Sequence, residues 1–211
     1  MGGRGRAEAT EAHSDEESSS DDRVGILSAV LRGSSAEILG RLVADDPLRL
    51  AEFGARRMRA RYFLFDPDRI TERLMARVAH AGARARPEDL DRQWLEGQTD
   101  QVLGDLIEED RNEEGDAPMD CVPEDPRYEI LRSIWVEDRF ARAASLAFNT
   151  LPESCRRAFY HLALEERSVE SVLALDIWDE DGLHRDICRA IGALGLGSKD
   201  GRPELEWDGR T

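Results

Sequence analysis

The stretch LPESCRRAFYHLALEERSVESVLALDIWDEDGLHRDICRAIGAL, residues 151–194, decides the fold. It holds three segments in which apolar residues recur every three or four positions, and short polar breaks separate them. This spacing predicts three amphipathic helices that together form a compact helix-turn-helix unit. Ser168 is placed to cap the second helix, and Asp181 or Asp179 to cap the third. The positions expected to face inward are Ala158, Phe159, Leu162, Leu164, Val169, Val172, Leu173, Leu183, Ile187, Ile191 and Leu194.

The composition of the whole chain favours an all-α fold. Of its 211 residues 40% are apolar, enough to bury a core, and only 6% are aromatic. Runs that alternate apolar with polar residues, which would indicate strands, are absent. Cys121, Cys155 and Cys188 are widely separated, which fits reduced thiols, and no apolar run is long enough for a signal peptide or a membrane span. We therefore expect an all-α cytoplasmic protein without a membrane partner.

Changes in composition divide the chain into segments. The first 23 residues are rich in Gly, Ser and acids and have no apolar periodicity, so they cannot repay the entropy of ordering. Between residues 105 and 125 ten acids stand against one base, Arg111, and prolines follow. The predicted segments are a disordered acidic tail (1–23), a small helical domain (24–112), an acidic linker (113–126), a second small helical domain that includes the helix-turn-helix (127–197), and a tail (198–211).

Prolines and glycines predict where the remaining helices begin and end. Asp66 and Pro67 fit the N-cap and the first position of a helix that ends near Gly82, and Pro87 starts another helix that runs to about residue 110. Residues 127–149 are predicted to be helical again. The tryptophans at apolar helical spacing are expected to anchor the core: Trp94, Trp135 and Trp178.

The charge pattern limits the choice of partners. A net charge of −16 argues against a general polyanion binder, although it does not exclude a local basic face. Residues 49–86 hold ten arginines against four acids, with aromatic residues between them. Such a stretch fits a grip on nucleic acid or on an acidic protein, but charge runs are more often a solvated helix face.

Residues 151–194 resemble region four of the extracytoplasmic-function group of bacterial sigma factors, whose pattern is LPxxxRxxFxLxxxEGxSxxEIAxxLGxSxGTVKSRLxRAxxAL. The residues that fit this pattern or lie within one position of it are Leu151, Pro152, Glu153, Arg157, Phe159, Leu162, Glu165, Ser168, Glu170, Val172, Gly182, Arg189, Ala190, Ala193 and Leu194. Residues 47–110 show a weaker likeness to region two. It is carried by Phe65-Asp66-Pro67-Asp68 with Ile70-Thr71-Glu72, and by Trp94-Leu95 followed by Asp105-Leu106-Ile107.

The resemblance implies a transcription-initiation protein that binds core RNA polymerase, with promoter DNA and an anti-sigma protein as further partners. The residues that the resemblance assigns to DNA are Arg156, Arg157, Arg167, His184, Arg185 and Arg189. Those on the helix that resembles the polymerase-docking one are Arg69, Arg73 and Arg77.

The chain also departs from the family pattern. Glu108, Glu109 and Asp110 follow the region-two-like helix where the family has basic residues, and they would repel phosphate. The turn glycine is replaced near Asp176. These departures leave a second hypothesis open, a sigma-like adaptor that has lost DNA binding and acts through protein contacts.

Sites for catalysis or metal find little support in the sequence. No GxSxG, phosphate-binding glycine pattern or HExxH motif is present. Cys155, His161, His184 and Cys188 are zinc-compatible types, but they lack CxxC or HxxxH spacing. We therefore expect no enzyme, no cofactor, no metal and no small-molecule substrate.

Overall fold

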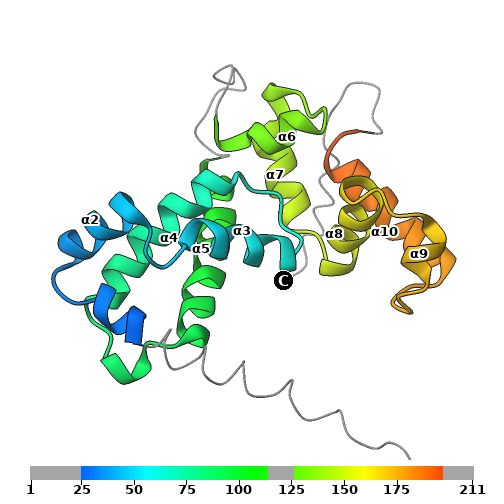
Figure 1. The fold of residues 1–211 in the computed structure, drawn as a ribbon. Helices are drawn as coiled ribbons and strands as arrows, with labels where there is room; N and C mark the ends of the chain where they lie inside the picture. Colours follow the sequence, from blue (N-terminus) through cyan, green and yellow to red (C-terminus); the bar gives the residue numbers. More distant parts are fainter. Residues whose placement is uncertain (1–24, 114–125, 197–211) are drawn as a thin grey trace, which may run out of the picture. The chain divides into compact units, whose positions relative to one another are not determined.

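The computed structural model describes residues 25–113 and 126–196 (Figure 1). Within these ranges all regular structure is helical and no strand occurs, so the all-α expectation is confirmed there. The predicted acidic tail, nearly all of the linker with Cys121, and the C-terminal tail lie outside the described residues. The first helices are 25–30, α2 (Ser35–Asp45), α3 (Leu50–Ala60), α4 (Pro67–Gly82), η1 (Pro87–Asp89) and α5 (Arg92–Glu113). The later ones are η2 (Pro126–Tyr128), α6 (Glu129–Ser133), η3 (Asp138–Phe140), α7 (Ala141–Asn149), α8 (Glu153–Phe159), η4 (Tyr160–Leu164), α9 (Val169–Leu173) and α10 (Glu180–Ala193).

Helix α4 follows the sequence prediction at both ends. Pro67 is its first residue, and the Asp66 carboxylate accepts a hydrogen bond of 3.1 Å from the backbone N–H of Asp68. This bond satisfies one of the N–H groups that have no partner inside a helix. The helix ends at Gly82, as predicted. An added Cβ at Gly82 would lie 3.0 Å from Leu31, so packing also favours glycine there.

The predicted helix at 127–149 is interrupted between α6 and η3. The N–H of Trp135 donates to the carbonyl of Arg132, and the N–H of Val136 donates to that of Leu131. Trp135 has a φ of 70°, so these bonds form the left-handed closure known as a Schellman motif. The Trp135 side chain is 89% exposed, and the expectation that it anchors the core is wrong.

The described residues group into two compact units, and the boundary differs from the predicted one near residue 112. One unit consists of residues 25–50 with 75–98, so α4 and α5 each contribute to both units. Within it the Arg41 guanidinium donates to the carbonyls of Val30 and Arg32, and Arg77 donates to Gln98. The other unit consists of residues 51–74, 99–113 and 126–196.

The larger unit has a continuous apolar core that joins its early and late residues. Leu64 lies on the turn before α4 and packs with residues of η2, α6, α7, α8 and α10. The rings of Phe148 and Phe159 meet edge to face at a centroid distance of 5.3 Å. The buried members of this cluster are Leu64, Tyr128, Leu131, Val136, Ala141, Ala144, Phe148, Phe159, Tyr160, Ala190 and Leu194.

Candidate nucleic-acid interface

Helices α8, α9 and α10 form a small three-helix cluster in residues 153–193 (Figure 1). A turn of π-helix, η4, continues α8 before the chain turns into α9. Ala158, Val172 and Leu183, one from each helix, are buried against each other. The partly buried residues packed on these three are Leu162, Leu173 and Trp178.

Two polar side chains fix the starts of α9 and α10. The Ser168 hydroxyl accepts from the N–H of Ser171 at 3.2 Å, as the sequence predicts for the N-cap of α9. The Asp179 carboxylate accepts from the N–H of Gly182 at 2.7 Å, so Asp179 rather than Asp181 caps α10. Between them Asp176 has a φ of 56°, a left-handed conformation that short polar residues tolerate and glycine prefers.

Asp186 holds α10 against α8 and the turn before α10. Its carboxylate accepts from the indole N–H of Trp178 at 2.9 Å and from the thiol of Cys155 at 3.3 Å. Burial raises the pKa of Asp186, but the hydrogen bonds from Trp178, Ser154 and Cys155 and the Arg189 charge lower it below its ordinary value. Burial and the nearby carboxylate raise the pKa of the Cys155 thiol to about 11, so this thiol stays protonated near neutral pH.

The exposed face of α10 brings together three of the predicted groove residues. His184, Arg185 and Arg189 are all exposed on α10. Arg185 and Arg189 are four residues apart and so lie one turn apart on the same side of the helix, and His184 is adjacent to Arg185 in sequence. Cys188 is also exposed there, with its sulfur 3.8 Å from the His184 Nε2. Glu180 and Asp181 lie in the first turn of the same helix. The face is therefore mixed in charge, with cations in its middle and acids at its N-terminal end.

The other three predicted DNA contacts are buried or paired with groups of the protein. Arg156 is buried, where its guanidinium donates to the backbone carbonyls of Asn149 and Leu151 at 2.9 Å and lies 4.0 Å over the Phe63 ring. Arg157 is half-buried over the Tyr62 ring, and the Arg167 Nε is 2.8 Å from the Glu165 carboxylate. These contacts explain why arginines adjacent in sequence need not share a cationic surface.

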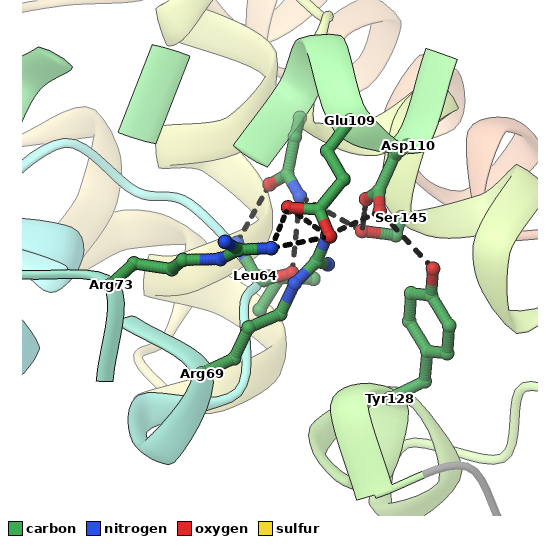
Figure 2. A network of polar contacts seen from close by, with 8 residues as sticks. Leu64, Arg69, Arg73, Glu109, Asp110, Tyr128 and Ser145 are labelled. Carbon is green, nitrogen blue, oxygen red and sulfur yellow. Dashed lines mark hydrogen bonds and ion pairs between the residues drawn. The ribbon is translucent and has the colours of Figure 1, made fainter. Parts of the chain in front are cut away.

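Arg69, the first residue predicted to dock on polymerase, is buried in an ion pair. Its guanidinium lies 2.8 Å from the Asp110 carboxylate, which is 0% exposed (Figure 2). Arg73, one turn along α4, is exposed and pairs with Glu109 at 2.8 Å. Arg77, in the other unit, is half-buried. Asp110, expected to repel phosphate, is instead buried and paired with Arg69.

Three more side chains complete the network around Asp110 (Figure 2). The Tyr128 hydroxyl donates to this carboxylate at 3.1 Å and the Ser145 hydroxyl at 2.9 Å. Asn149 donates to Ser145 and to the carbonyl of Leu64, and its amide oxygen accepts from the Leu64 N–H. A buried carboxylate with donors from three different segments is well satisfied, so we assign the network to the stability of this unit.

No family model matches the chain, and no match was found among curated proteins or solved structures. None of the described helices is long and apolar enough to span a membrane. In residues 25–113 and 126–196 no three His, Cys, Asp or Glu side chains gather as metal ligands would. Cys155 bonds to Asp186 and His161 to Glu165, so these two zinc-compatible residues are directed to different partners, while Cys188 contacts His184.

Proposed function

We propose that this chain is a sigma-factor-like transcription protein that binds core RNA polymerase, and that its α8–α10 cluster is a helix-turn-helix that contacts promoter DNA. The observation that carries the proposal is the exposed face of α10, which presents His184, Arg185 and Arg189 together. In helix-turn-helix proteins the last helix of such a unit lies in the major groove, with side chains at the base edges. The capped start of α10 and the buried contacts of Leu183 support a rigid helix in that role.

Each basic side chain has a distinct place in this proposal. Arg185 and Arg189 are suited to bidentate contacts with guanine edges or to single phosphates, because a guanidinium offers paired donors. Arg167 precedes α9, and its pairing with Glu165 lowers the net positive charge that it would offer to a phosphate. We leave Arg156 and Arg69 out of both interfaces, since their side chains are buried and bonded inside the protein.

The DNA part is tested by salt-dependent binding of the full chain to promoter duplexes. Replacing Arg185 and Arg189 with alanine should weaken binding and lower the slope of log K against log salt by about 2, because two phosphate-neutralising charges are lost. The control is Arg139→Ala, which removes an arginine of η3 whose side chain is 59% exposed and which lies outside the arginine-rich stretch 49–86. Equal binding by the double variant and the control would contradict a groove role for α10.

The polymerase part is tested by a pull-down with purified core RNA polymerase at low salt. The full chain should be retained, and Arg73→Ala should weaken retention, because Arg73 is the exposed member of the predicted docking set. A chain that is not retained at low salt would overturn the sigma-like proposal.

A second candidate function, an adaptor without DNA binding, is favoured by the charge around α9 and α10. Residues 165–189 hold eight acids against three arginines: Glu165, Glu166, Glu170, Asp176, Asp179, Glu180, Asp181 and Asp186 against Arg167, Arg185 and Arg189. Val169, Leu175 and Ile177 are exposed in the same stretch. Such a surface suits a basic, partly apolar protein better than a polyanion. Retention on polymerase without measurable duplex binding at low salt would favour this function.

A further inference from the structure

Trp135 occupies a position at which proteins usually place glycine. The backbone closes α6 through two hydrogen bonds, from Trp135 to Arg132 and from Val136 to Leu131, and the residue at this point must have a positive φ. A bulky side chain is strained in that conformation because its Cβ approaches the neighbouring carbonyl. The buried contact between Leu131 and Val136 that accompanies such a closure does not involve the indole.

Two other helices in the same unit end with the same pair of backbone hydrogen bonds. Their residue with positive φ can be compared with Trp135. Helix α10 closes with Gly195 at a φ of 74°, where no side chain is present. Helix α3 closes with Tyr62 at a φ of 59°, and the Tyr62 ring packs against Tyr160 at 5.6 Å. Tyr62 thus contributes to the core, whereas Trp135 carries the strain with a side chain that is 89% exposed.

Trp135 combines a strained backbone with a large exposed aromatic ring, and this combination indicates that a partner molecule binds the ring. Strained residues persist where function requires them, and tryptophan is the residue most enriched among the anchors of protein interfaces. The backbone at Trp135 is fixed by these two hydrogen bonds, so little backbone entropy would be lost when the indole enters a pocket.

The charges next to Trp135 favour a protein over a nucleic acid. Single strands bind where bases stack on aromatics inside a cationic groove. Here Arg139 is 2.7 Å from Glu137 and Arg132 is 3.7 Å from Asp138, so the flanking arginines have carboxylates beside them. The rim of the exposed indole is therefore electrically balanced, which suits an apolar pocket with a polar border.

We propose that Trp135 is an anchor that inserts into an apolar pocket of core RNA polymerase. This inference rests on the proposed function, which supplies the partner, and it adds a contact that the family resemblance does not assign. It also accounts for the exposure of an aromatic residue that the sequence pattern predicts to be buried.

The test compares Trp135→Gly with the wild-type chain for binding to purified core RNA polymerase. Glycine is the favoured residue at this φ, so the variant should fold at least as well as the wild type, with an equal or higher Tm. Its affinity for polymerase should fall at least tenfold. Trp135→Asn, which also tolerates the left-handed conformation, should give the same loss. The control is Val43→Ala, since Val43 is 67% exposed on α2.

The outcomes separate this inference from the proposed function. Wild-type binding that both Trp135 variants lose and the control keeps would support the anchor. Wild-type binding that the glycine and asparagine variants retain would overturn the anchor and leave the proposed function in place. No binding by the wild type would overturn the proposed function, and the anchor with it.

Discussion

Among single residues, Asp110 is the one whose change should destabilise the protein most. Its carboxylate is fully buried and accepts from Arg69, Tyr128 and Ser145. In Asp110→Asn the buried guanidinium of Arg69 keeps only the more distant Glu109 carboxylate, 3.6 Å away and 26% exposed, as a counter-charge, so the free energy of unfolding should fall by up to about 3 to 5 kcal/mol. Urea denaturation of the purified variant measures this loss.

The neighbouring pair Arg73–Glu109 gives the control, because it joins the same two helices at the surface. The Arg73 side chain is 57% exposed, so solvent screens the pair and Arg73→Ala should cost less than about 1 kcal/mol. If both variants lost the same free energy of unfolding, burial of the Asp110–Arg69 pair would have no effect on its contribution to stability.

Asp176, at a φ of 56°, permits a second test at a single residue. Valine is β-branched and should be strained there, so Asp176→Val should lower the free energy of unfolding by about 1 to 2 kcal/mol. Asp176→Gly should change it by less than about 1 kcal/mol, since relief of strain offsets the greater freedom of the unfolded chain. Thermal unfolding of the two variants side by side checks the order, and a glycine variant less stable than the valine variant would contradict it.

At the scale of elements, the start of α10 depends on the Asp179 cap. Asp179→Ala leaves the N–H of Gly182 without its partner and should cost about 1 kcal/mol of unfolding free energy. Asp179→Ser removes the same charge but keeps a capping oxygen, so it should lose much less. Chemical denaturation of both variants separates the cap from the charge. If serine and alanine were equally harmful, the negative charge rather than the cap would be the stabilising feature.

The contact between α8 and α10 should weaken in acid because of Asp186. Its pKa is lower in the folded protein than the ordinary value of 3.8. The stability it contributes is therefore fully present above that value and is lost as the pH falls through the lower folded pKa. The difference in unfolding free energy between the wild type and Asp186→Asn should be largest near pH 6 and shrink below about pH 4. A difference that is constant from pH 3 to pH 6 would exclude this linkage.

Elements with strong local signals could be predicted from the sequence. The start of α4 at Pro67, its end at Gly82 and the Ser168 cap follow from backbone preferences that act within a few residues. The break at Trp135 could not be predicted, because no glycine or proline marks it and the closure depends on how Leu131 and Val136 are buried.

The candidate site was less accessible to sequence reasoning than the helices. The family resemblance assigned His184, Arg185 and Arg189 to DNA, and all three are exposed on α10, whereas their contact with DNA stays a prediction. The resemblance could not show that Arg69 and Arg156 are buried, since their partners lie 41 residues away at Asp110 and at the backbone of the preceding turn. An arginine is buried only where acceptors of the folded chain meet its guanidinium, and that information is in the tertiary structure.

At the scale of the whole molecule, residues on both sides of the predicted linker share one core. Leu64 is buried among the C-terminal helices, and its backbone N–H and carbonyl both bond to the Asn149 amide. Asp110 is bonded to Tyr128 and Ser145. A fragment cut at the predicted boundary would lose these partners and expose the apolar surface that they cover.

We therefore predict that residues 127–197 alone do not unfold cooperatively, whereas the full chain does. The control is the full chain with a protease site placed within 114–125 and cleaved after folding. Its two pieces should stay together in gel filtration and dissociate only in denaturant, because the core and the Asp110 network need no covalent link between them. A fragment 127–197 that shows a sharp thermal transition by itself would mean that Leu64 and Asp110 add little to this unit. It would then restore the domain boundary that the sequence suggests.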